Sequence, residues 1–206
     1  MKILVTGGAR SGKSSFAEKY ATTFAGRGIY IATSEVHDQE MRDRVDLHQL
    51  KRGQYAFSWQ TIEEPYDVNE CIDSIDEDFG TNVILIDCLT LWLSNWLLRV
   101  EYDQNTVMTS LEGENGEKES YSEVQKKVIA KIEQLVASLK RFDGTILLVT
   151  NEVGNGIVPE YPLGRIYRDL SGIMNQKIAE VCDQVFLVTA GIPVELKSKQ
   201  FCFKEG

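Results

Sequence analysis

Short apolar runs recur along the chain and alternate with segments of helical spacing. Six runs are rich in strand-forming residues, and they cover 2–6, 28–33, 56–61, 82–87, 145–150 and 184–189. Nearly continuous apolar strands separated by helices are typical of a parallel sheet that is buried on both faces. The pattern therefore predicts an α/β fold, with a mostly parallel sheet and helices on both sides.

Helical periodicity is clearest in two places. Apolar residues recur at helical spacing around 66–77, and again from Tyr121 to Leu139, where positions 124, 128, 132, 135 and 139 share one face. The segment IPVELK follows the sixth apolar run closely, through Ala190-Gly191. We therefore expect it to add a short antiparallel strand at the edge of the sheet.

Residues 101–120 break the pattern, because they are polar and acid-rich with little periodicity. We expect a mobile surface insertion here, and an ordered active-site lid is the alternative. No other segment has the composition of a linker, and there is no internal repeat. The sequence therefore predicts a single domain over 1–206 that carries this insertion.

Composition excludes several classes of partner. The 206 residues carry a formal net charge of −9 and no basic stripe, so we expect no nucleic-acid partner and no anionic membrane surface. The most apolar stretch, 89–98, is too short to span a bilayer. Four scattered cysteines indicate neither a disulfide framework nor a zinc site. Since the first strand leaves no room for a signal peptide, we expect a cytoplasmic protein.

The string GGARSGKS at 7–14 has the spacing of a P-loop, G-x-x-x-x-G-K-[ST]. Its glycines allow successive backbone N–H groups to point at phosphate oxygens. Lys13 would reach the outer phosphates, and the Ser14 hydroxyl would bind Mg²⁺. An apolar strand precedes the loop and a helical pattern follows it, which aims a helix N-terminus at an anion. The sequence thus predicts a nucleotide-binding domain of the P-loop NTPase type.

A P-loop alone is compatible with small-molecule kinases, GTPase switches and motor or recombinase ATPases. Asp87 ends the run VILID, where such a fold places a carboxylate directed at Mg²⁺. An acid that caps a turn at the end of a strand is the alternative for this residue. The N-K-x-D string expected of a guanine-reading switch is missing from the sequence, which disfavours that class.

The chain has two histidines, His37 and His48. From about residue 38 to Gly53 the pattern predicts a helix, on which Arg44, Lys51 and Arg52 share the face of His48. One interpretation is a solvated basic face. The other is an imidazole beside a cationic phosphate clamp, because histidine is a covalent nucleophile and nearby positive charge favours its neutral form.

Four blocks occur in order: GGARSGKS, IATSE with the segment that carries His48, DCLTLWLSN, and the block from LLVTNEVGNGIVP to IPVELK. Together they resemble the bifunctional adenosylcobinamide kinase / adenosylcobinamide-phosphate guanylyltransferase of bacterial cobalamin synthesis. The resemblance covers nearly the whole chain, apart from 101–120. It implies a RecA-like variant of the P-loop fold.

The resemblance implies two successive transfers. A nucleoside triphosphate, ATP or GTP, first phosphorylates the aminopropanol hydroxyl of adenosylcobinamide. GTP then guanylylates a histidine with release of pyrophosphate, and GMP passes to adenosylcobinamide phosphate. The nucleophile corresponds to His48, with Lys13 as the second catalytic residue.

The resemblance also implies the contacts and the assembly. Mg²⁺ would bind Ser14 and Asp87, and the assembly would be a homotrimer. The implied nucleotide contacts are Gly7, Gly8, Ala9, Arg10, Ser11, Gly12, Lys13, Ser14, Ala32, Thr33, Ser34, Gln49, Leu50, Lys51, Arg52, Glu63 and Asp87.

Two positions depart from some family members. Asp87 stands where some have glutamate, and Leu47 precedes His48 where some have a second histidine. Two alternatives stay open beside the resemblance. One is a plain ATP-dependent kinase in which His48 is a surface residue. The other is a recombinase-like ATPase that acts through assembly, which would require basic nucleic-acid loops.

Overall fold

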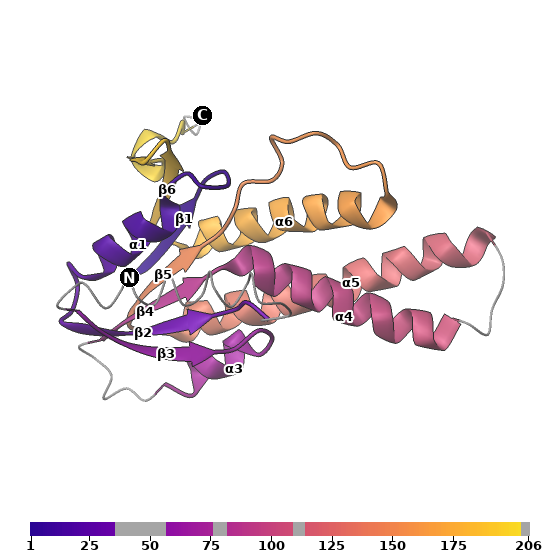
Figure 1. The fold of residues 1–206 in the computed structure, drawn as a ribbon, viewed down its shortest axis with the longest axis horizontal. Coiled ribbons are helices and arrows are strands. Elements are labelled where there is room, and N and C mark those ends of the chain that lie inside the picture. Colours follow the sequence, from indigo (N-terminus) through magenta and orange to yellow (C-terminus); the bar gives the residue numbers. More distant parts are fainter. Residues whose placement is uncertain (36–56, 76–81, 109–113, 203–206) are drawn as a thin grey trace.

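The fold is built on one seven-stranded sheet with the strand order β3-β2-β4-β5-β1-β6-β7 (Figure 1). The computed structural model describes residues 1–35, 57–75, 82–108 and 114–202. Every neighbouring pair of strands is parallel except β6 and β7. The strands are β1 (Lys2–Thr6), β2 (Arg27–Ala32), β3 (Ser58–Glu63), β4 (Asn82–Asp87), β5 (Thr145–Val149), β6 (Gln184–Thr189) and β7 (Ile192–Glu195).

The predicted mostly parallel sheet of a P-loop fold and its antiparallel edge strand are therefore confirmed. Five of the six predicted strands agree with the observed bounds to within one residue. β3 begins two residues after the predicted 56, and it is the outermost strand at one edge of the sheet.

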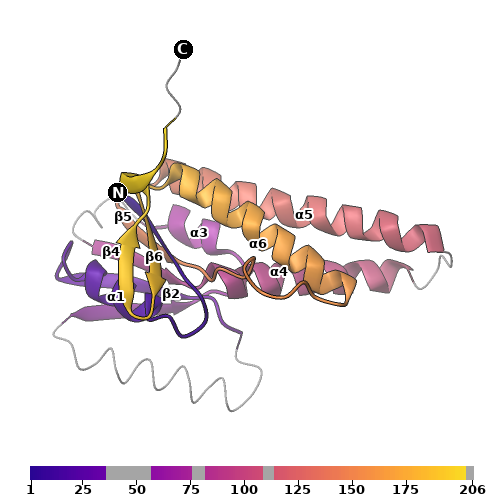
Figure 2. The same ribbon diagram turned by 90° about the horizontal axis from the view of Figure 1, so that it is seen from above.

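Helices cover both faces of the sheet (Figure 2). Alternate residues of a strand point to opposite faces, so Ile3 and Val5 pack in one cluster with α1, while Leu4 packs in the other with the remaining α-helices. The helices are α1 (Lys13–Ala21), α3 (Val68–Asp73), α4 (Leu89–Met108), α5 (Glu114–Arg141) and α6 (Pro162–Val181), with a 3₁₀ turn η2 (Lys197–Lys199).

Helix α5 packs against α3, α4 and α6, and α4 also contacts α6. The five apolar positions predicted to share its face, from Val124 to Leu139, are all buried. Among the described helices, none combines the length and the apolar character needed to cross a bilayer.

Residues 101–108 and 114–120 are helical, a feature that the sequence analysis did not predict. Helix α4 continues through Met108 and α5 begins at Glu114, so the two helices project together beyond the sheet (Figure 1). Glutamate, glutamine and lysine favour helices by their own propensity. The sequence carries little apolar periodicity in this segment, so its helices could not be predicted from the pattern.

Candidate active site

The loop 7–14 connects β1 to α1 and has the backbone form of a phosphate cradle. Gly12 precedes the first residue of α1 with φ 93°, and Arg10 has φ 57°. The Ser11 N–H donates to the Gly8 carbonyl oxygen at 3.3 Å, which closes a turn inside the loop. A Cβ at Gly7 would lie 2.4 Å from the Val188 carbonyl oxygen, so no larger residue fits there. The N-terminus of α1, with its unpaired N–H groups, therefore opens onto the loop.

Lys13 begins α1 and is buried, with 9% of its surface exposed. Its Nζ donates to the Gly8 carbonyl oxygen at 3.1 Å, so the ammonium lies over the loop. A buried cation is costly unless it is paired. The bound anion for which this loop is shaped would supply the missing negative charge.

The turn between β6 and β7 braces the P-loop, a contact that the sequence analysis missed. Ala190 and Gly191 both have positive φ, 52° and 79°, as a two-residue type I′ hairpin requires. The Gly191 N–H donates to the Ser11 carbonyl oxygen at 2.8 Å. A Cβ at Gly12 would lie 3.3 Å from the Gly191 Cα, so the two backbones are in close contact. The pair Ala190-Gly191 indicates a turn in the sequence. The contact between this turn and the P-loop could not be predicted, because it depends on the pairing of β6 with β1.

Asp87 ends β4, and β5 separates that strand from β1. The Tyr30 hydroxyl on β2 donates to the Asp87 Oδ2 at 3.1 Å, which orients the carboxylate. The next residue, Cys88, is buried, and burial together with the neighbouring Asp87 charge raises its pKa to about 11. Cys88 therefore stays a neutral thiol and is not a candidate nucleophile.

Thr33, which follows β2, is wholly buried, and its hydroxyl is already paired. Thr33 Oγ1 donates to the Cys88 carbonyl oxygen at 2.6 Å and accepts from the Cys88 N–H at 2.9 Å. The buried Asn95 Nδ2 donates to the carbonyl oxygens of Thr33 and Pro65, at 2.9 and 3.1 Å. Helix α4 thus joins the ends of β2 and β3. A nucleotide contact from the Thr33 hydroxyl would have to break its bonds to Cys88.

The two acids at the end of β3 differ in their surroundings. Glu63 is exposed. The Glu64 Oε1 accepts from the N–H groups of Tyr66 and Asp67, at 3.0 and 2.9 Å, just before α3 begins. Glu63 is therefore the acid that can turn toward a ligand, whereas Glu64 shapes the loop.

The predicted site residues at the ends of β1, β2, β3 and β4 meet at one edge of the sheet, because parallel strands end together. They are the P-loop, Ala32 to Ser34, Glu63 and Asp87. The predicted site residues of the segment after Ser34 lie outside the described residues, namely His48, Gln49, Leu50, Lys51 and Arg52, and so does His37. Their roles stay predictions.

The residues at this edge fit Mg²⁺. In the part of the chain that the structure describes, no group of three or more His, Cys, Asp and Glu residues could hold a metal ion. Mg²⁺ is usually bound by one or two carboxylates together with substrate phosphates, so it needs no such group. The Ser14 hydroxyl on the first turn of α1 and the oriented Asp87 carboxylate provide oxygen ligands of this kind. In addition, the buried Ser11 Oγ in the loop has no hydrogen-bond partner among the described residues.

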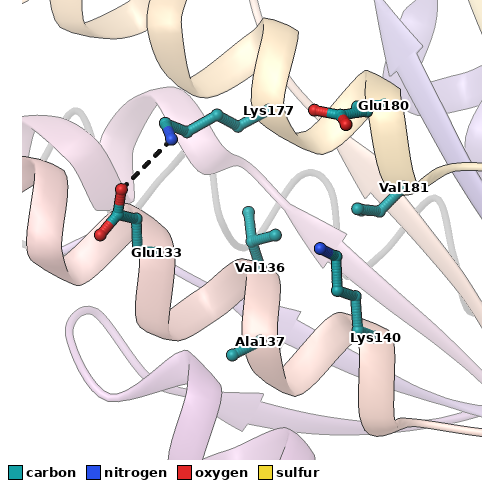
Figure 3. A pocket seen from close by; sticks show the side chains of 7 residues that line it. All are labelled: Glu133, Val136, Ala137, Lys140, Lys177, Glu180 and Val181. Carbon is teal, nitrogen blue, oxygen red and sulfur yellow. Dashed lines mark hydrogen bonds and ion pairs between the residues drawn. The ribbon is translucent and has the colours of Figure 1, made fainter.

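A groove of about 250 Å³ lies between α5 and α6, near the ends of these helices that lead into β5 and β6 (Figure 3). Its lining includes an ion pair between Lys177 and Glu133, at 3.2 Å. This is the amino edge of the sheet, so the groove is separate from the candidate active site.

Comparison with known proteins identifies relatives that match nearly the whole chain. Residues 3–196 match the sequence family described as cobinamide kinase / cobinamide phosphate guanyltransferase. The bifunctional adenosylcobalamin biosynthesis protein CobU of Escherichia coli K12 is 37% identical over 198 residues, covering 96% of this chain and 100% of the relative. CobU of Salmonella typhimurium is 40% identical over 200 residues, with 96% and 100% covered. CobP of Pseudomonas aeruginosa is 37% identical over 199 residues, with 97% and 99% covered.

Two solved structures show a more distant likeness. A Pyrococcus horikoshii OT3 protein has a TM-score of 0.49 and 8% identity, over 95% of this chain and 85% of its own. An ATPase from the type III secretion system of pathogenic bacteria has a TM-score of 0.47 and 10% identity, over 98% of this chain and 58% of its own.

Proposed function

We propose that the carboxyl edge of the sheet carries out two transfer reactions, because this chain belongs to the cobinamide kinase / cobinamide phosphate guanyltransferase family. The chain is a bifunctional kinase and guanylyltransferase of adenosylcobalamin biosynthesis. The observation that carries the placement is the buried Lys13 ammonium, which lies over a loop whose helix N-terminus faces the same space.

In the kinase reaction, the loop amides of 7–14 bind the phosphates of ATP or GTP, and Lys13 stabilises the charge on the transferring group. The hydroxyl oxygen of adenosylcobinamide forms a bond to the γ-phosphorus, and the bond to the nucleoside diphosphate breaks. Ser14 and Asp87 would hold Mg²⁺, which would neutralise phosphate charge. Catalysis of this kind depends mainly on positioning, which the braced P-loop provides.

In the guanylyl reaction, we assign the nucleophile to His48. Its imidazole nitrogen forms a bond to the α-phosphorus of GTP, and pyrophosphate leaves. The phosphate of adenosylcobinamide phosphate then takes GMP from the histidine. Ala32, Thr33, Ser34 and Glu63 are the proposed nucleotide contacts from β2 and β3, together with Gln49, Leu50, Lys51 and Arg52. The assignment is supported by the resemblance, and by β2 ending at the same edge of the sheet as the P-loop.

The test uses GTP labelled at its α-phosphate. Wild-type protein should retain label after denaturation, in a bond that is acid-labile and base-stable, as a phosphoramidate is. His48→Asn should lose the label and the guanylyl transfer while it still phosphorylates adenosylcobinamide. His37→Asn, which alters the other histidine of the chain, is the matched control and should keep both activities.

Two results would contradict the assignment. If folded His48→Asn still incorporates label, the nucleophile is another residue. If wild-type protein phosphorylates adenosylcobinamide but never retains label during turnover, the enzyme does not transfer GMP through a covalent intermediate.

We further propose a homotrimer in the cytoplasm. The trimer is supported by the resemblance. The compartment is supported by four unpaired cysteines, because a reducing environment keeps thiols free.

A further inference from the structure

Asn151 lies at the junction between the two halves of the phosphate site. Strand β5 pairs with β1, which leads into the P-loop, and with β4, which ends at Asp87. Asn151 comes two residues after the end of β5. The topology therefore places it between the Lys13 loop and the Asp87 carboxylate, at the edge where a nucleotide would bind.

Hydrogen bonds from three directions fix the backbone around Asn151. The Asn151 N–H donates to the Thr90 Oγ1 at 2.8 Å, and the Asn175 Nδ2 donates to the Asn151 carbonyl oxygen at 3.2 Å. The next residue, Glu152, donates its N–H to the Gly7 carbonyl oxygen at 3.1 Å. Since Gly7 is the first residue of the P-loop, Asn151 is held in a defined position beside the phosphate cradle.

Unlike its backbone N–H and carbonyl groups, the side-chain oxygen of Asn151 has no hydrogen-bond partner among the described residues. This Oδ1 atom is closed off from solvent. A buried polar atom without a partner costs about 1–3 kcal/mol. The residue as a whole is partly exposed, so the Nδ2 end of the carboxamide is the end that a ligand at this edge of the sheet can reach.

We infer that the Asn151 carboxamide contacts the γ-phosphoryl group during the kinase reaction. Its N–H₂ group donates to a γ-phosphoryl oxygen. The hydroxyl oxygen forms the new bond to phosphorus, the bond to the nucleoside diphosphate breaks, and the hydroxyl proton passes to solvent. This assignment rests on the proposed function and adds a catalytic residue to it.

The test compares two asparagines of one loop. Asn151→Ala should lower the kcat of cobinamide phosphorylation by at least about tenfold, with the KM for nucleotide within about threefold of wild type. Its melting temperature should stay the same or rise, because the variant removes an unpaired buried group rather than a hydrogen bond. Asn155→Ala alters an exposed asparagine and should change neither quantity.

Binding gives a second readout that needs no corrinoid. Calorimetry with Mg²⁺ should show that wild-type protein binds a non-hydrolysable nucleoside triphosphate more tightly than the diphosphate. Asn151→Ala should lose most of this difference, whereas Asn155→Ala should keep it.

Three outcomes would overturn the inference: wild-type kcat in Asn151→Ala, an activity loss accompanied by a comparable fall in melting temperature, or an unchanged preference for the triphosphate. A wild-type protein that phosphorylates no cobinamide would instead contradict the proposed function. The binding comparison would still decide the role of Asn151 in that case.

Discussion

Single buried side chains hold the loops of the candidate site in place by donating hydrogen bonds to backbone carbonyl oxygens. Asn95 joins the carbonyl oxygens of Thr33 and Pro65. Trp92 and Trp96, on the same helix, both donate their indole N–H to the Tyr66 carbonyl oxygen, at 2.7 and 3.0 Å. Helix α4 thereby fixes the loop after β3 through three side chains.

Lys13 gives the residue-scale prediction. Lys13→Ala should lower the kcat of cobinamide phosphorylation by at least about a hundredfold, because it removes a preorganised positive charge from the transferring phosphate. The variant should keep the far-ultraviolet circular dichroism of the wild type, because the only hydrogen bond it loses among those described is the one to Gly8.

Lys19→Ala is the matched control, since Lys19 is an exposed lysine on the same helix. It should retain wild-type turnover. Near-wild-type turnover in folded Lys13→Ala would contradict the assignment of the P-loop.

At the scale of elements, strand positions could be predicted because the strands are buried on both faces. The buried run Val83–Ile86 of β4 shows this, since its residues alternate between the two core clusters and all are apolar. β3 was located less well because it is an edge strand with several exposed residues. The helical part of 101–120 was missed because its sequence is polar and acid-rich with little apolar periodicity.

The projecting helix pair should be dispensable for stability. Replacing residues 103–118 with a short Gly-Ser linker should change the free energy of unfolding by about 1 kcal/mol or less, because loop length affects closure entropy only weakly. The packed parts of α4 and α5 are retained, since Val100 and Val124 are buried on either side of the deletion. Denaturant unfolding and turnover would measure the effect. A large loss of stability or of activity would show that the pair is a packed element or a lid.

Glu195 at the end of β7 should make stability depend on pH. Its carboxylate accepts N–H bonds from Val185, Ser198 and Lys197, which lower its pKa from the ordinary value of 4.5 to about 2. A pKa lowered in the folded state stabilises the fold fully above the ordinary value, and this contribution is lost as the pH falls from 4.5 toward 2.

Glu195→Gln should therefore melt at a lower temperature than wild type at pH 7, with the gap closing as the pH falls toward 2. Thermal unfolding monitored by circular dichroism would test this, with the exposed Glu160→Gln as the control. A gap that is the same at all pH values would show that the charge of Glu195 does not contribute.

At the scale of the whole molecule, the candidate site consists of strand ends that are far apart in sequence. The P-loop could be predicted because its residues are contiguous and its spacing is specific. Asp87 could be placed at the end of a strand, but the bracing by Gly191 and the position of Asn151 follow from the order β4-β5-β1-β6. A pattern of apolar runs predicts strands without predicting which of them are neighbours.

The proposed trimer is the prediction at this scale. Light scattering after size exclusion should give a mass three times the 23.3 kDa of one chain. The value should not change on dilution if the assembly is stable. A mass equal to that of one chain would contradict the trimer.

The position of β1 in the sheet has a consequence for synthesis on the ribosome. Among the described strands, β1 pairs with β5 and β6, and its Lys2 N–H donates to the Asp183 Oδ2, 181 positions later in the chain. The segment that carries the P-loop therefore emerges long before the strands that flank it. A nascent chain cannot brace the candidate phosphate loop through the β6–β7 turn until translation has passed Gly191. The candidate phosphate loop is therefore made early and receives its bracing hydrogen bond from Gly191 only after about 180 further residues have been added.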